Sequence, residues 1–313
     1  MHSYKDLLRL LAGDVLLVLT LFLSSCSTSN DNSYTTATTV VSPPPRQVLR
    51  VVPKPREIVD LENERDGGSP SMPVLKILFP PNGTTISNST VPVRISLTSN
   101  LKPSAVYDDK IALTLDNEPY LAGYPYHLRP QVAKLFGPFE LRNVVKGRHL
   151  LRAFVLKPTL ETYKNEDALR MTTFTIAADS NDTKPTVTSA GEVIADERQP
   201  TGQFVGGQLE VDTAKPLLTF ALPNGMKITS DVPLVIDFYL SNAKLKGDGG
   251  EYRVRYIIDD EDPQWIDKWE PVWLAGWIEG THTVRLELIG PDGWPFLNGG
   301  YNIITREVSV ANH

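Results

Sequence analysis

The chain carries one cysteine, Cys26, and its neighbours suit it to thiol chemistry. An apolar run at residues 15–23 precedes it, and the four residues Leu23-Ser24-Ser25-Cys26 close that run. A single cysteine excludes an intramolecular disulfide. Its thiolate is the best nucleophile in the chain for forming a thioether. The residue type therefore suits Cys26 to thioether formation.

The histidines and acidic residues do not form a catalytic or metal-binding pattern. His149 and His282 begin two similar segments, which favours a structural role for both. The chain has no Gly-x-Ser-x-Gly or His-Glu-x-x-His motif and no histidine spacing that suits a metal. The acidic run at 259–262 corresponds to a turn at 116–119, so we interpret it as a turn rather than a calcium loop. We predict no catalytic residue, no metal and no cofactor.

Three tryptophans are candidate contacts for a ligand. Trp265, Trp269 and Trp294 lie beside prolines and charged residues near the C-terminus. Exposed indole rings stack on sugars or anchor a protein partner. The alternative is that the three rings cap one end of a folded domain.

The segment at 150–156 offers a second candidate contact surface. Successive residues of a strand point to opposite faces, and here both faces are apolar, with Phe154 and Leu156 on the second face. Contiguous exposed apolar strips are rare on soluble proteins. We expect residues 121–139 or the inter-domain segment to cover Phe154 and Leu156; if both are exposed, they form a partner-binding patch.

The segments that contain the paired histidines and the apolar strip alternate in polarity every second residue, which is the pattern of β-strands. Gly147-Arg148-His149 and Gly280-Thr281-His282 each open a segment that alternates at that period, and the second copy has one wet face made of Thr283, Arg285 and Glu287. Similar pairs occur at 74–79 and 217–222, and at 91–98 and 232–239. The 25 prolines and 21 glycines favour turns over long helices. The sequence therefore predicts an all-β, duplicated chain.

The N-terminus resembles that of bacterial lipoproteins. Leu23-Ser24-Ser25-Cys26 is similar to the lipobox, and the preceding apolar run is too short to span a bilayer. The resemblance implies a signal peptide at 1–25, acyl chains on Cys26, and a membrane-anchored position in the cell envelope. Ser27 favours the outer membrane or cell surface. A flexible, disordered tether is expected at 26–73, although residues 48–52 could dock locally.

The two repeats resemble tandem immunoglobulin-like or fibronectin-III-like β-sandwiches of exported proteins. We place them at 74–178 and 216–313, joined by a linker at 179–215 that could form a small hairpin. The resemblance implies a non-enzymatic role in binding, adhesion or scaffolding, with a protein or polysaccharide partner. The alternative function is carbohydrate binding through the tryptophans of the second sandwich. Interspersed charges and a net charge of −6 argue against a nucleic-acid partner.

Overall fold

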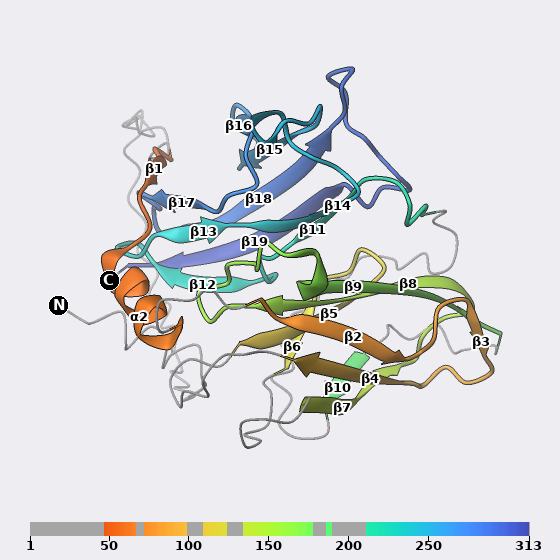
Figure 1. The fold of residues 1–313 in the computed structure, drawn as a ribbon. Helices are drawn as coiled ribbons and strands as arrows, with labels where there is room; N and C mark the ends of the chain where they lie inside the picture. The colour runs from red at the N-terminus through yellow and green to blue at the C-terminus, as the bar shows by residue number, and fades with distance from the viewer. Residues whose placement is uncertain are drawn as a thin grey trace, which may run out of the picture. The chain divides into compact units, whose positions relative to one another are not determined.

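The computed structural model describes residues 47–66, 72–98, 109–123, 134–177, 186–189 and 211–312. This part is built from β-strands (Figure 1), and the secondary structure also includes one α-helix, α2 (Arg56–Asp66), and two short 3-10 turns. The structure confirms the predicted all-β fold. The signal peptide and Cys26 lie outside the described residues. No helix in the described ranges is long and apolar enough to cross a membrane.

The first β-sandwich has two sheets, with strand orders β10-β7-β4-β2 and β3-β9-β8-β5-β6. Strand β4 alternates buried and outward side chains, as a strand with one covered face must. Its buried residues Val91, Val93 and Ile95 pack in one core with residues of the other sheet. The strands are β2 (Val74–Phe79), β3 (Thr84–Ile86), β4 (Val91–Thr98), β5 (Lys110–Leu115), β6 (Leu121–Gly123), β7 (Lys134–Arg142), β8 (Gly147–Leu156), β9 (Leu169–Ile176) and β10 (Thr186–Ser189).

The second β-sandwich repeats this plan with one interruption. One face is the sheet β12-β19-β18-β15-β16, and the other consists of the ribbon β11-β14 and the sheet β1-β17-β13. Asp237 divides the strand predicted at 232–239 into β13 and β14. The strands are β11 (Leu217–Phe220), β12 (Met226–Thr229), β13 (Leu234–Ile236), β14 (Phe238–Ser241), β15 (Arg253–Ile258), β16 (Gln264–Ile266), β17 (Val272–Ala275), β18 (Gly280–Ile289) and β19 (Ile303–Ala311).

The two Gly-x-His segments begin β8 and β18 with the same polar arrangement. His149 Nδ1 lies 2.9 Å from Asp116 Oδ2, and its Nε2 lies 2.8 Å from the Val145 carbonyl. His282 repeats both contacts with Asp259 and the Ile278 carbonyl, at 2.6 and 2.9 Å. Asp116 and Asp259 both have positive φ, in the turns that directly follow β5 and β15. The shared geometry makes the histidines part of the fold, because each ties a strand entry to a turn.

Part of the segment predicted as a flexible tether has regular structure. Residues 48–66, here called the strap, contain β1 (Arg50–Val52) and α2. Strand β1 pairs antiparallel with β17 of the second sandwich. Helix α2 buries Ile58 completely. A β-carbon at Gly276, which has φ of 98°, would lie 2.7 Å from the Val48 carbonyl oxygen, so this glycine admits the strap backbone.

The strap also forms ion pairs with the first sandwich. Lys54 Nζ lies 2.5 Å from Glu62 and 2.6 Å from Glu161, which follows β8. Glu62 also pairs with Lys157 at 2.9 Å. The strap therefore contacts both sandwiches, and all three belong to one compact unit that spans Val48–His313.

The face of β18 that the sequence predicted to be solvent-exposed is partly buried. Glu287 is 0% exposed, because its carboxylate lies between two guanidinium groups. Arg255 Nε approaches Glu287 Oε2 at 2.5 Å, and Arg285 contacts Oε1. Alternation alone predicted an exposed glutamate; pairing across the strands instead buries it.

Candidate functional site: a cleft between the two sandwiches

A buried arginine anchors the two sandwiches to each other. Arg152 of β8 donates from Nη1 to the Leu218 carbonyl and to Thr219 Oγ1, both at 3.0 Å. Its Nη2 donates to the Asp116 carbonyl at 2.6 Å, and its guanidinium lies over the Tyr301 ring. Burial lowers the pKa of Arg152 to about 10, which still leaves it cationic at neutral pH. A buried cation with these partners fixes the orientation of β8 against β11.

An aromatic seam continues this contact along β8. Phe154 packs edge-on against Tyr120 and against Tyr239 of the second sandwich, with centroid distances of 5.3 and 5.8 Å. The Tyr239 hydroxyl donates to the Val155 carbonyl at 2.8 Å and accepts from the Tyr163 amide. Burial raises the pKa of Tyr239 well above its ordinary value, so the hydroxyl remains a donor. The seam joins the core of the first sandwich to the second.

This seam settles where Phe154 and Leu156 lie. Both are 0% exposed, so neither is available to an external partner in this structure. The strip is covered, as expected; the two segments considered as its cover, 121–139 and 179–215, lie in large part outside the described residues. Tyr120, next to one of those segments, and Tyr239 of the second sandwich contact Phe154. The second apolar face of β8 thus serves as an inter-sandwich contact.

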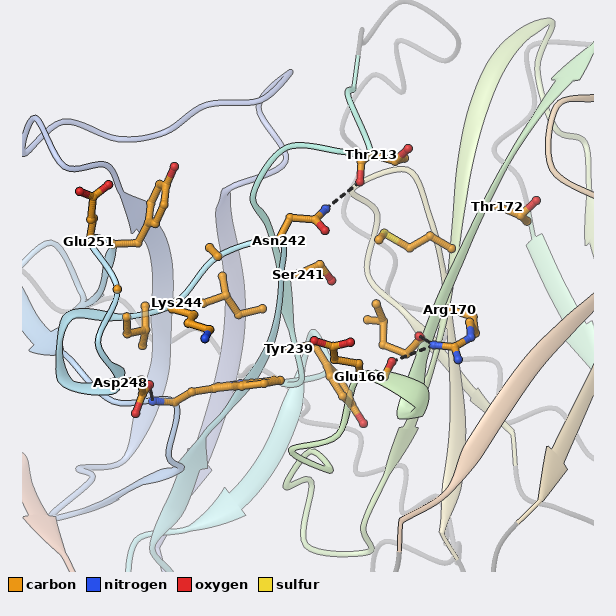
Figure 2. A pocket seen from close by; sticks show the side chains of 18 of the residues that line it. Glu166, Arg170, Thr172, Thr213, Tyr239, Ser241, Asn242, Lys244, Asp248 and Glu251 are labelled. Carbon is orange, nitrogen blue, oxygen red and sulfur yellow. Dashed lines mark hydrogen bonds between the residues drawn. The ribbon is translucent and has the colours of Figure 1, made fainter.

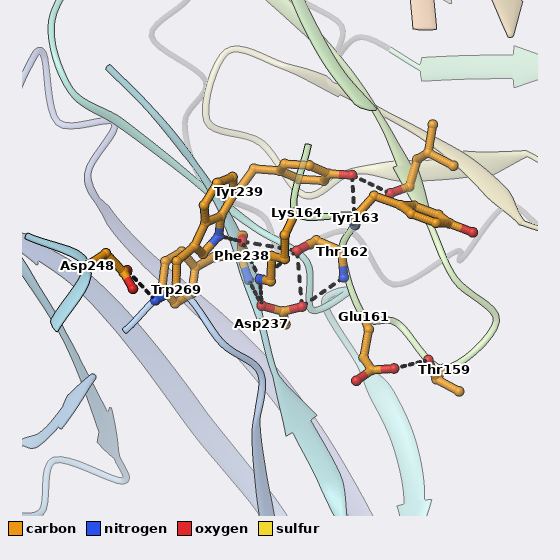
Figure 3. Close-up of polar contacts among 11 residues, drawn as sticks. Thr159, Glu161, Thr162, Tyr163, Lys164, Asp237, Phe238, Tyr239, Asp248 and Trp269 are labelled. Carbon is orange, nitrogen blue, oxygen red and sulfur yellow. Dashed lines mark hydrogen bonds and ion pairs between the residues drawn. The ribbon is translucent and has the colours of Figure 1, made fainter. Parts of the chain in front are cut away.

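A polar cluster lies beside the seam and is shown in Figure 3. Asp237 Oδ2 accepts from the Thr162 amide and hydroxyl at 2.8 and 3.0 Å, and Oδ1 accepts from Lys164 Nζ at 2.5 Å. Burial lowers the pKa of Lys164, and the nearby Asp237 charge partly offsets that effect. Lys164 also lies over the Trp269 ring, whose Nε1 donates to the Phe238 carbonyl at 2.7 Å. The cluster ties residues 162–164 to the point where Asp237 breaks the strand.

A cleft of about 1010 Å³ lies between β9 and the segment that begins with β14. Figure 2 shows Glu166 and Arg170 on one wall and Ser241, Lys244 and Glu251 on the other. Carboxylates, cations, hydroxyls and aromatic rings all contribute to its lining. Clefts of this size and mixed lining, positioned between domains, are common ligand sites. The walls are supplied by Asn82, Glu166, Leu169, Arg170, Met171, Thr172, Thr173, Thr213, Tyr239, Leu240, Ser241, Asn242, Ala243, Lys244, Leu245, Asp248, Gly250, Glu251, Tyr252 and Trp269.

The three candidate tryptophans belong to different elements. Trp269 lines the cleft, half-buried, with its amide held by Asp248 at 2.8 Å. Trp265 on β16 is 44% exposed and stacks under the Arg253 guanidinium, 3.9 Å from the ring centroid. Trp294 follows β18 in a loop and is 73% exposed. Of the three, only Trp269 lines the cleft.

Sequence reasoning missed Arg152, Tyr239 and Asp237. The available signal for Tyr239 was the segment 232–239, which carries Val235 and Tyr239 on the face opposite its main apolar residues. That two-faced pattern matches the one in β8, and the two segments meet at the seam.

Across the described ranges, no group of three His, Cys, Asp or Glu side chains is placed to hold a metal.

Comparisons with known proteins give only distant likenesses. No family model matches the chain, and no characterised protein sequence matches it. The chain is similar to fibronectin(III)-like modules of Clostridium thermocellum CbhA (13% identity, TM-score 0.24, covering 76% of this chain and 95% of that one). It is also similar to Bacteroides ovatus SGBP-B, solved with a mixed-linkage heptasaccharide (13% identity, TM-score 0.19, covering 76% and 70%). TM-scores this low support no argument about function.

Proposed function

We propose that this protein is a lipid-anchored envelope protein with a non-enzymatic binding or scaffolding role, and that the inter-sandwich cleft is its binding site. The cleft is the observation that carries the proposal. Arg152 and Tyr239 fix the two sandwiches to each other, so the two walls of the cleft are held in one relative arrangement before a partner binds. Preorganised walls lower the ordering cost of binding.

The anchor rests on the sequence around Cys26. A diacylglycerol thioether with a further acyl chain on the freed amine would hold the protein firmly on a bilayer. The chain between Cys26 and Val48 extends by at most ~3.5 Å per residue, which limits its reach to roughly 75–80 Å. Because β1 pairs with β17, the chain joins the folded body on the second sandwich, although that sandwich is the later one in sequence.

The anchor is tested by Cys26→Ala in the full-length chain. We expect the variant to move from the membrane fraction to the aqueous phase of a detergent partition and to lose label from radioactive palmitate. Ser25→Ala, which keeps a small residue beside the cysteine, serves as the control and should stay lipidated. Unchanged membrane retention of Cys26→Ala would refute lipidation at this residue.

The binding site is tested by photo-crosslinking on cells. A photoreactive amino acid at Glu166 or Glu251 lies on a cleft wall. The same group at Lys227 on β12 is exposed but does not line the cleft and provides the matched control. We expect a discrete adduct from the two cleft positions only. Equal labelling at all three positions would contradict a binding role for the cleft.

Carbohydrate binding is the second candidate, because two indoles are exposed and a third lines the cleft. It is tested by electrophoresis of the soluble chain through gels that contain polysaccharides, with tryptophan fluorescence followed as sugars are added. The soluble chain must retain the strap, since removing residues 1–73 would delete β1 and α2. Absence of both retardation and a spectral change would exclude this candidate.

A further inference from the structure

Strand β14 has an open backbone edge at the cleft. The Phe238 carbonyl faces away from β11, because it accepts from Trp269 Nε1. Backbone groups of an antiparallel strand alternate in direction, so the amide and carbonyl of Leu240 also point away from β11. Leu218, the residue opposite Leu240 on β11, agrees with this. Its amide donates to Asn302 and its carbonyl accepts from Arg152, so neither group is directed at β14. Within the described residues, no hydrogen bond involves the Leu240 backbone, and Leu240 lines the cleft.

Strand β9 has a matching open edge on the opposite wall. Thr173 faces away from β8, since its amide donates to Asn82 Oδ1 and its carbonyl accepts from the Gly83 amide. By the same alternation, the amide and carbonyl of Met171 point away from β8. Strand β3 pairs with β9 only from Phe174 onward. The part of the chain that the structure describes supplies no hydrogen bond to the Met171 backbone, and Met171 lines the cleft.

Among the described residues, both edges have hydrogen-bond partners up to the cleft and none at Leu240 and Met171 within it. On β14, Trp269, Thr162 and Lys164 all donate to the Phe238 carbonyl. On β9, Asn82 and Gly83 cover Thr173. Open strand edges invite pairing with another chain, and native proteins generally cover them. Two edges that no described residue covers, on facing walls of one cleft, point to a ligand that supplies main-chain partners.

We propose that the cleft binds an extended polypeptide segment of the partner, which adds as a β-strand along the open edges at Leu240 and Met171. This inference rests on the proposed function and names its partner class. The outward groups of a strand recur every second residue, about 6.6–6.8 Å apart, which is the spacing that another strand presents. Main-chain hydrogen bonds would provide affinity, as in other strand-addition complexes.

Side chains at the cleft would select the segment. Each wall carries both signs of charge: Glu166 and Arg170 lie on one wall, and Lys244 and Glu251 lie on the other, as Figure 2 shows. Charged side chains of the incoming segment can pair with them, while Trp269 and Tyr252 offer apolar surface. A polysaccharide could use the same side chains but does not present the N–H donors and C=O acceptors of a polypeptide backbone at the spacing of a strand.

The test starts from a library of random 12-residue peptides selected against the chain from residue 27 onward. Proline at an outward position removes the open N–H without removing a ladder hydrogen bond. We expect Leu240→Pro or Met171→Pro to weaken binding of the selected peptides at least tenfold. Leu240→Met and Met171→Leu keep the N–H and should bind as the wild type does. Hydrogen exchange at the amides of Leu240 and Met171 should slow when the peptide is added.

A second set of probes covers the case in which a proline variant fails to fold. N-methylation of the selected peptide at successive positions should abolish binding at every second residue. The proposal is overturned if neither proline variant nor any N-methylation changes affinity, or if polysaccharides bind in the cleft and no peptide is selected. Failure of the cleft crosslinks would remove the proposed function itself, whereas crosslinks to a non-protein partner would remove only this inference.

Discussion

At the scale of residues, Glu62 and Glu161 share one cation but differ in acidity. Lys54 lies within 2.6 Å of both carboxylates. Burial raises the pKa of Glu161, and the Lys54 charge offsets this only in part. Burial also acts to raise the pKa of Glu62, but hydrogen bonds from Lys54 and Lys157 bring it below the ordinary value of 4.5. At the strap, folding therefore favours ionisation of the Glu62 carboxyl and disfavours ionisation of the Glu161 carboxyl.

These opposite shifts predict two pH windows for stability. The folded state favours the Glu62 carboxylate, so its contribution is lost as pH falls below 4.5 through the folded pKa. The folded state binds the Glu161 proton more tightly than the unfolded state, so stability declines as pH rises from 4.5 through the raised pKa. Urea unfolding at a series of pH values should show that Glu161→Gln removes the second decline.

Glu62→Gln is the control for that experiment, because it should remove the loss of stability as pH falls below 4.5 and leave the decline above 4.5. A Glu161→Gln variant whose stability follows the wild-type curve throughout would show that Glu161 carries no penalty in the folded protein.

Asp237 should matter more to stability than its partner Lys164. Removing the carboxylate takes away the acceptor of the Thr162 and Phe238 amides and the ion-pair partner of Lys164. Breaking a buried ion pair from one side costs about 3–5 kcal/mol. In chemical denaturation, we expect Asp237→Ala to lower the free energy of unfolding by that amount. Lys164→Met should lower it less, since Thr162 still donates hydrogen bonds to the Asp237 carboxylate. Equal losses would show that the ion pair alone accounts for the stabilisation.

Residue identities predicted part of this chemistry. The paired histidines followed from duplication, and both make the same contacts with a turn aspartate. The roles of Arg152 and Asp237 could not be predicted, because their partners lie in the other sandwich. A polar residue in an apolar strand is not informative until the surface that covers it is known.

At the scale of elements, the strap is the main departure from expectation. Its composition between Pro53 and Gly68 is strongly charged, which is typical of a solvated segment. The strap becomes ordered because Ile58 enters a buried position and because β17 offers a free edge to β1. The apolar residues at 48–52 indicated local docking, but a three-residue strand has too little periodicity for its pairing partner to be predicted from sequence.

Removing the strap should destabilise the protein. We expect a chain that begins at residue 74 to unfold at lower urea than one that begins at residue 47. Burial of Ile58 alone contributes about 1.5–3 kcal/mol, so the loss should be at least of that size. Equal midpoints for the two chains would show that the strap is not part of the folded body.

Gly276→Ala separates the strap contact from backbone strain. The added β-carbon would meet the Val48 carbonyl oxygen, and the positive φ is strained by any side chain. The substitution should therefore cost more in the chain from residue 47 than in the chain from residue 74. Identical costs in both chains would assign the whole effect to φ.

At the scale of the whole molecule, the duplication predicted two sandwiches but not the buried contact between them. The second apolar face of β8 indicated that something covers it, and the structure identifies Tyr120 and Tyr239 against Phe154. Which surface lies opposite depends on the relative placement of the domains, and periodicity along one strand carries no information about that. The cleft could not be predicted for the same reason, since its walls come from both repeats.

Calorimetric unfolding of the chain from residue 27 onward tests most directly whether the sandwiches form one body around the cleft. We expect one transition whose calorimetric and van't Hoff enthalpies agree. Phe154→Ala should lower the entire transition, at a cost of about 3–5 kcal/mol. Two separate transitions, with Phe154→Ala shifting only one of them, would contradict the account.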